Sequence, residues 1–121
     1  MRKRNIWVGV TVSLLIFTAP ANSEDSANTF LKTYDNGDKI TKKYLEDILM
    51  SNENGMSWMN TVLEGLDKSN DRRVYCTKNS SLNGNDDVAI LKHAIESDKE
   101  LGSYPFGMAF LYAMKRRYPC E

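Results

Sequence analysis

The chain contains few side chains that could act as a nucleophile or a general base. It has one histidine, His93, and two cysteines, Cys76 and Cys120. A Cys/His hydrolase needs a reduced thiol beside the imidazole, and we expect both cysteines to be oxidised, for the reason given below. His93 lies at the boundary of an apolar stripe, which is typical of a surface histidine. The sequence therefore predicts no catalytic dyad.

Metal and phosphate sites have no better support. Asn83, Asn85, Asp86 and Asp87 resemble part of a calcium loop, but the closing Glu of that loop pattern is missing, so helix capping is the better interpretation. No cluster of His, Cys and carboxylate side chains has the spacing of metal ligands. No glycine pattern could cradle a phosphate group. We expect no metal, no cofactor and no enzymatic activity.

Residues 1–23 have the pattern of a secretory signal peptide. A charged start, MRKRN, precedes the apolar stretch IWVGVTVSLLIFTAPA, and Ala21 and Ser23 occupy the small-residue positions of a cleavage site. The alternative is an uncleaved membrane anchor, but the apolar run is shorter than a typical span and contains Pro20. We expect cleavage before Glu24 and export to the periplasm, leaving residues 24–121 as one domain.

Loss of the leader changes the charge balance. The whole chain has 16 basic and 16 acidic residues, and the leader contains three of the basic residues and none of the acidic ones. The remaining chain therefore has 13 basic residues, 16 acidic residues and a net charge of −3. Without a basic stripe that includes aromatic side chains, nucleic-acid binding is not expected.

Both cysteines lie in the exported part, where thiols oxidise. Only one pairing is possible within a chain, and we expect a Cys76–Cys120 disulfide; two free thiols or an intermolecular bridge are the alternatives. The internal bridge would stabilise a small domain by about 4 kcal/mol in the chain-entropy description. It would also fasten the C-terminal helix to the middle of the fold.

Apolar periodicity predicts an all-α fold: a small single-domain bundle of about four helices, with one disulfide. The expected helices lie within residues 27–38, 41–70, 88–97 and 105–117. Thr41 is the expected cap of the second helix, which Asn54-Gly55 could split in two, although one long helix is favoured. Asp86 or Asn85 is the expected cap of the third.

The second helix shows one apolar stripe from Tyr44 to Leu66. The last helix is apolar around most of its circumference, so it should lie at the centre of the bundle or be shared with a second subunit in a dimer.

The connector DKELGSY is the most interesting candidate for recognition. It lies between two predicted helices and combines carboxylates, small residues and an aromatic side chain. The alternative is a simple helix–helix connector. Its residues are Asp98, Lys99, Glu100, Leu101, Gly102, Ser103 and Tyr104.

From Phe30 to Cys120 the chain resembles the Tai immunity proteins of type VI secretion systems, specifically those that neutralise the family-four Tae amidases. More distantly it is similar to the wider Rap/Tai group. The matching features are the exported start, the tyrosine-containing long helix, the segment RRVYC, and the helical segment that ends in Tyr118-Pro119-Cys120. The wider group often has Cys-Ile-Pro where this chain has Cys76-Thr77-Lys78, which favours the amidase-immunity subgroup.

The resemblance implies a periplasmic antitoxin that inhibits an injected peptidoglycan amidase. Such amidases are papain-like Cys/His hydrolases that cut the γ-D-glutamyl–diaminopimelate bond. Family members are helical homodimers in which a helix of one subunit and a loop of the other engage the amidase. Here the helix would be 87–97, with Lys92, His93 and Glu96 as contact residues, and the loop would be 98–104.

Two other functions fit a small, exported, helical chain with one disulfide. A periplasmic acid-stress chaperone of the HdeA type would expose apolar surface when acidified. A lysozyme-type inhibitor would differ from an amidase inhibitor only in its target enzyme.

Overall fold

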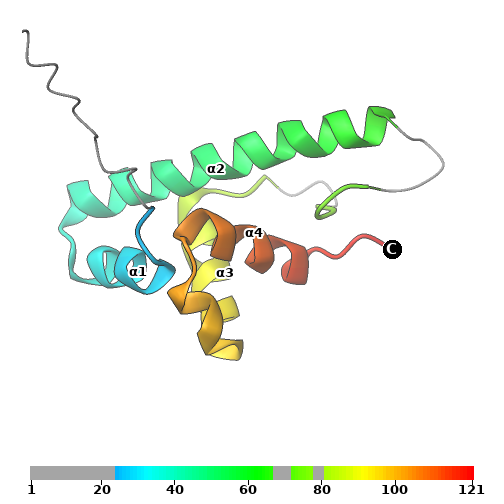
Figure 1. Cartoon of the computed structure of the whole chain (residues 1–121). Coiled ribbons are helices and arrows are strands. Elements are labelled where there is room, and N and C mark those ends of the chain that lie inside the picture. The colour runs from blue at the N-terminus through cyan, green and yellow to red at the C-terminus, as the bar shows by residue number, and fades with distance from the viewer. Residues whose placement is uncertain (1–23, 67–71, 78–80) are drawn as a thin grey trace, which may run out of the picture.

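The computed structural model of the chain describes residues 24–66, 72–77 and 81–121. Within these ranges the fold is all-α, as predicted, with four α-helices and one short 3₁₀ helix. Figure 1 shows α2 running along one side of the molecule, with α1, α3 and α4 gathered on one side of it. The elements are α1 (Ala27–Asn36), α2 (Lys39–Leu66), α3 (Gly84–Ser97), the 3₁₀ helix η1 (Lys99–Ser103) and α4 (Phe106–Arg117).

Helix α1 follows its predicted limits closely. The Ser26 hydroxyl caps its start by accepting from the Thr29 amide at 3.2 Å, and Gly37 follows its last turn. Phe30 and Tyr34 lie one turn apart and are both buried. The Tyr34 hydroxyl donates to Glu46 Oε1 at 2.7 Å, which fixes α1 against the N-terminal half of α2.

Helix α2 is one unbroken helix of 28 residues that passes through Asn54-Gly55. It begins at Lys39, and the carboxylate of Asp38 accepts from the amide of Thr41 at 2.8 Å. The prediction that Thr41 caps this helix was therefore wrong, because Asp38 supplies the capping oxygen. At about 1.5 Å per residue the helix is about 42 Å long.

The start of α3 also differs from the prediction. Asn83 is the N-cap, and its side chain accepts from the amides of Asn85 and Asp86, both at 3.0 Å. The Asp86 carboxylate accepts in return from the Asn83 amide at 3.1 Å, which completes a capping box. Asp86 therefore takes part in the cap as the reciprocal partner and not as the cap residue.

Helix α4 lies at the centre of the bundle. Ala109, Phe110, Ala113 and Met114 have at most 1% of their surface exposed, and α4 packs against α1, α2 and α3. Only Met108 and Tyr112 expose substantial apolar area on this helix. The sequence predicted that this apolar helix lies either in the core or at a subunit interface. Most of its surface lies in the core.

Only part of the long apolar stripe predicted for α2 is buried in the fold. Leu45 and Leu49 are buried against the bundle, whereas Tyr44 on the same helix is 64% exposed. In the C-terminal half, Val62 and Leu66 are 60% and 70% exposed. Much of the apolar surface of α2 therefore has no partner among the described residues.

Candidate functional site: the η1 projection and the α3–α4 groove

The connector between α3 and α4 is not an open loop but the 3₁₀ helix η1. Asp98 begins it, and its Oδ1 accepts from the amide of Glu100 at 3.2 Å. The other oxygen of the same carboxylate accepts from the Arg116 guanidinium of α4 at 2.6 Å. The hydrogen bond from Arg116 is the main reason that the pKa of Asp98 is lowered. One side chain thus shapes η1 and ties it to α4.

Glu100 organises the outer surface of η1. The Ser103 hydroxyl donates to the Glu100 carbonyl at 2.8 Å, and the Tyr104 hydroxyl donates to Glu100 Oε1 at 3.3 Å. The negative charge of Glu100 is the main reason that the pKa of Tyr104 is raised. Lys99, Glu100 and Ser103 are exposed, and Tyr104 is half-buried. η1 therefore presents a carboxylate, an ammonium group and a hydroxyl to solvent from a braced backbone.

Two of the seven predicted contact residues in the connector are buried. Leu101 is 3% exposed and belongs to the core. Gly102 is also buried, and a Cβ placed there would collide with the carboxamide of Asn28 on α1. In this chain these two residues hold η1 against the bundle, which leaves the others to face a partner.

The segment before α1 supports both ends of this region. The Ala27 amide donates to the Tyr104 carbonyl, and the Phe106 amide donates to the Asp25 carbonyl, both at 2.9 Å. Pro105 offers no side-chain cap to α4, and Glu24 Oε1 instead accepts from the Gly107 amide at 3.3 Å. The residues just after the predicted cleavage point therefore form part of the η1 support.

The predicted contact residues on α3 point in different directions. Lys92 forms an ion pair with Asp35 at 2.5 Å and lies 5.4 Å from the centre of the Tyr34 ring. It is therefore engaged with α1. His93 and Glu96 are exposed. Of the three predicted contact residues on α3, these two are therefore free to contact a partner.

His93 lines a groove of about 880 Å³ between α3 and α4. Leu82, Ile90 and Ala94 contribute apolar surface to it, and Arg116 and Arg117 contribute positive charge. Because Arg116 also binds Asp98, the groove begins at the base of η1. Apolar surface beside guanidinium groups suits a protein segment that carries both apolar and acidic side chains.

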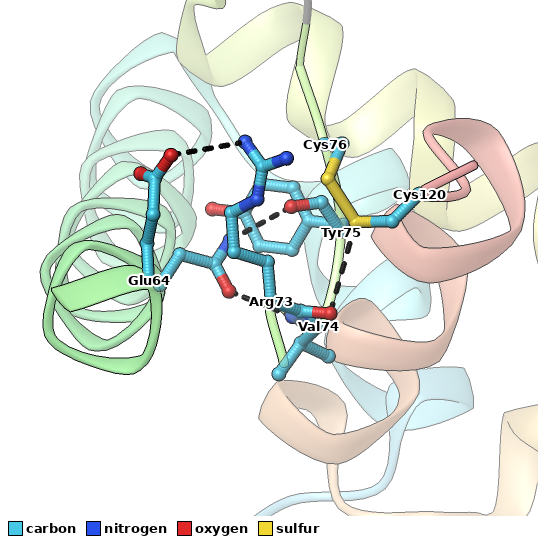
Figure 2. Close-up of a disulfide and its surroundings, with 7 residues drawn as sticks. Glu64, Arg73, Val74, Tyr75, Cys76 and Cys120 are labelled. Carbon is cyan, nitrogen blue, oxygen red and sulfur yellow. Dashed lines mark hydrogen bonds and ion pairs between the residues drawn. A yellow bond between two sulfur atoms is a disulfide. The ribbon is translucent and has the colours of Figure 1, made fainter. Parts of the chain in front are cut away.

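The predicted disulfide is present, with an S–S distance of 2.03 Å between Cys76 and Cys120. Figure 2 shows it beside the extended segment that contains Val74 and Tyr75, which crosses between α2 and the C-terminus. The Cys76 amide donates to the Tyr118 carbonyl at 2.8 Å, so a backbone hydrogen bond reinforces the bridge. The covalent link fastens the end of α4 to the segment that follows α2, as the sequence predicted.

Asn60 on α2 is a structural residue that the sequence did not reveal. It is 8% exposed, and its carboxamide accepts from the Val74 amide at 2.8 Å and donates to the Tyr75 carbonyl at 2.9 Å. A polar residue on the buried side of an otherwise apolar helix face is the signal that could have identified it.

Asp87 was also missed. It is fully buried on α3, and neither of its carboxylate oxygens has a hydrogen-bond partner among the described residues. Burial, followed by the charges of Glu53 and Asp86, raises the pKa of Asp87 to about 7. Burial also raises the pKa of Glu53. Asp87 is therefore partly protonated near neutral pH, and the electrostatic cost of burying it falls as the pH is lowered further.

Within the described residues, no group of three or more His, Cys, Asp or Glu side chains is arranged to hold a metal ion. Over the same ranges, no helix combines the length and the apolar character needed to cross a membrane. Comparison with known proteins gave no match to a family model, a curated protein or a solved structure.

Proposed function

We propose that this chain is a periplasmic immunity protein that binds a peptidoglycan amidase and blocks its Cys/His active-site cleft. The observation that carries the proposal is the 3₁₀ helix η1, which is held between two helices and exposes the Glu100 carboxylate on its outer side. The resemblance of Phe30–Cys120 to the Tai immunity proteins supplies the class of partner, and it also favours a homodimer. Export is supported by the leader-like residues 1–23 and is compatible with the disulfide.

The bracing of η1 suits it to inhibition. The amidase cleft accepts an acidic stem peptide, and a turn that carries a carboxylate and a hydroxyl resembles such a peptide in charge. Asp98, Tyr104 and the segment before α1 already hold η1 in one conformation. Little conformational entropy would then be lost on binding, so a small contact can give high affinity.

The α3–α4 groove would extend this contact. His93 and Glu96 lie on the same helix as the groove, and Arg116 connects the groove to η1. We therefore assign the partner-facing surface to the exposed residues of η1 together with this side of α3. Lys92, Leu101 and Gly102 support that surface from within.

An acid-stress chaperone has weaker support because the titration of Asp87 makes the fold more stable, not less, as the pH falls. Such a chaperone opens when acidified. Asp87 has a raised pKa in the folded chain, so its protonation stabilises the fold as the pH falls towards the unfolded value near 4. This buried group therefore opposes opening in acid.

The test is inhibition of a family-four type amidase acting on purified peptidoglycan. The chain, expressed with its own leader and purified from the cell envelope, is mixed with the amidase near neutral pH. Release of γ-D-glutamyl–diaminopimelate cleavage products is then measured by chromatography. We expect inhibition that saturates at one chain per amidase. Full amidase activity in the presence of excess chain, across a panel of such amidases, would contradict the proposal.

Ser103→Trp tests the role of η1. Ser103 is exposed on η1, and a bulky side chain there should obstruct entry into a cleft and weaken inhibition by at least about tenfold. Ser57→Trp is the matched control, because Ser57 is an exposed serine on α2, far along the chain from η1. If both variants inhibited the amidase equally, η1 would not be part of the interface. A bulky residue at Gly102 would be a poorer test, since it would displace Asn28.

A further inference from the structure

The most extensive uncovered apolar surface in the described part of the chain lies on α2. Six large apolar side chains on this helix are between 55% and 80% exposed. A run of this size along one helix is unusual on a monomeric protein and marks an interaction surface. These residues, here called the α2 stripe, are Ile40, Tyr44, Trp58, Met59, Val62 and Leu66.

Four of these six residues are spaced symmetrically about the middle of α2. Ile40 and Leu66 lie at equal distances along the chain from position 53, and Tyr44 and Val62 form a second such pair. Two copies of the helix laid antiparallel with position 53 at the crossing would therefore place Ile40 against Leu66 of the other copy. Tyr44 would likewise meet Val62. A two-fold interface between two copies of a chain is self-complementary in this way.

The centre of the same face carries small residues. Ser51 and Gly55 are exposed, are placed symmetrically about position 53, and lie one turn apart. A Cβ placed at Gly55 would have no neighbour within 4 Å. Helices approach closely where the side chains between them are small. The crossing point of the antiparallel pair thus coincides with the smallest residues of the face.

A hollow and a matching protrusion also occur on this face. A shallow hollow of about 390 Å³ is bordered by five residues on neighbouring turns of α2, namely Tyr44, Asp47, Ile48, Ser51 and Asn52. In the antiparallel register, Trp58 of the other copy lies opposite Ile48, at the middle of this hollow. Trp58 is 74% exposed. An indole from one helix would enter this hollow on its partner, as a knob enters a hole in a coiled coil, and by symmetry this happens twice.

We propose that the α2 stripe binds the α2 stripe of a second copy of this chain, as an antiparallel two-fold helix pair that crosses between Ser51 and Gly55. This inference rests on the proposed function and identifies the surface through which the chain would form a homodimer. The sequence left open whether α4 lies at the centre of the bundle or is shared with a second subunit, and most of α4 lies in the core. An unrelated partner, the amidase included, would not need the symmetrical spacing. Pairing through α2 leaves η1 and the α3–α4 groove of each copy for the amidase.

The experiment measures the mass of the exported chain in solution by sedimentation at micromolar concentrations, without amidase. We expect a dimer, and we expect Trp58→Glu to raise its dissociation constant by about 100-fold or more, because each dimer would lose two buried aromatic contacts. Ser57→Glu is the matched control. It adds the same charge to the neighbouring position, one residue off the stripe, and should leave the dimer intact.

A second variant excludes misfolding as the cause. Gly55→Leu improves helix propensity by about 0.5–1 kcal/mol, so it should not unfold the monomer, but it places a large side chain at the crossing point. We expect a weaker dimer whose monomer keeps its helix content, as measured by circular dichroism. The register is tested by mixing a tagged Ser51→Cys copy with an untagged Gly55→Cys copy, which should cross-link. A tagged Ser57→Cys copy mixed with the same partner should not.

Each alternative outcome overturns the assignment. A monomeric wild-type chain would do so, as would a dimer that resists both Trp58→Glu and Gly55→Leu. If the α2 stripe became covered only when the amidase was added, the stripe would be a binding surface for the amidase. None of these results decides inhibition, because a monomer that still blocks the amidase would leave the proposed function standing.

Discussion

The carboxamide of Asn60 binds both the amide of Val74 and the carbonyl of Tyr75, and so carries the extended segment that holds Cys76 onto the side of α2. The disulfide continues from that segment to Cys120 at the end of the chain. The C-terminus is thereby connected to α2 through one buried side chain and one covalent bond.

We expect Asn60→Leu to destabilise the chain by about 2 kcal/mol. The substitution removes two hydrogen bonds and leaves the Val74 amide and the Tyr75 carbonyl without their partner in a buried place. Urea denaturation followed by circular dichroism measures the change. Asn54→Leu, at an exposed position of the same helix, is the control and should alter stability by less than about 0.5 kcal/mol. Equal effects of the two substitutions would mean that the carboxamide of Asn60 adds no stability.

We expect the double variant Cys76→Ser/Cys120→Ser to lose about 4 kcal/mol of stability, because the unfolded chain is freed from a long closed loop. Denaturation of the wild-type chain with and without reductant should show a similar difference, while the double variant should not respond to reductant. A wild-type chain that is equally stable in reductant would contradict this.

The pH dependence of stability should reveal Asp87. Its pKa is about 7 in the folded chain and near 4 when unfolded, so between these values the folded chain binds more protons. Stability from this group is therefore greatest near pH 4, falls as the pH rises to 7, and is level above that.

We expect Asp87→Asn to remove this slope and to raise the free energy of unfolding at pH 8, relative to wild type, by on the order of 2 kcal/mol. The gain should shrink towards pH 4. Urea denaturation at a series of pH values measures it, with exposed Asp25→Asn as control. A gain that is the same at pH 5 and pH 8 would show that Asp87 does not titrate in this range.

Asp98→Asn should loosen η1 without unfolding the chain. The ion pair with Arg116 is partly exposed, so its loss should cost little stability. Hydrogen exchange at the amides of Glu100 and Leu101 should nevertheless accelerate, since both lie next to the Asp98 cap.

Asp47→Asn is the matched control for Asp98→Asn. It breaks another exposed ion pair, with Lys43 on α2, and should leave exchange in η1 unchanged. Unaltered exchange in Asp98→Asn would mean that η1 is held by Leu101 and the segment before α1 alone.

Local patterns in the sequence were enough to predict the helices and the covalent link. Apolar periodicity located all four α-helices, and Asn36-Gly37 marked the end of α1. Two cysteines allow one internal pairing, and the structure contains it. The capping residues of α2 and α3 were missed by a few positions, because Asp38 and Asn83 compete with equally suitable polar neighbours.

The sequence by itself determined which segments are helical, that the fold is all-α, and that Cys76 and Cys120 can join the middle of the chain to its C-terminal end. Those properties follow from spacing over a few residues and from the chemistry of thiols. The tertiary structure decided which side of α2 is buried, that Lys92 binds Asp35, and that Leu101 and Gly102 lie within the bundle. The reason is physical. An apolar stripe indicates that one face of a helix needs to be covered, but the packing of segments that are distant in the sequence decides which stripe is covered.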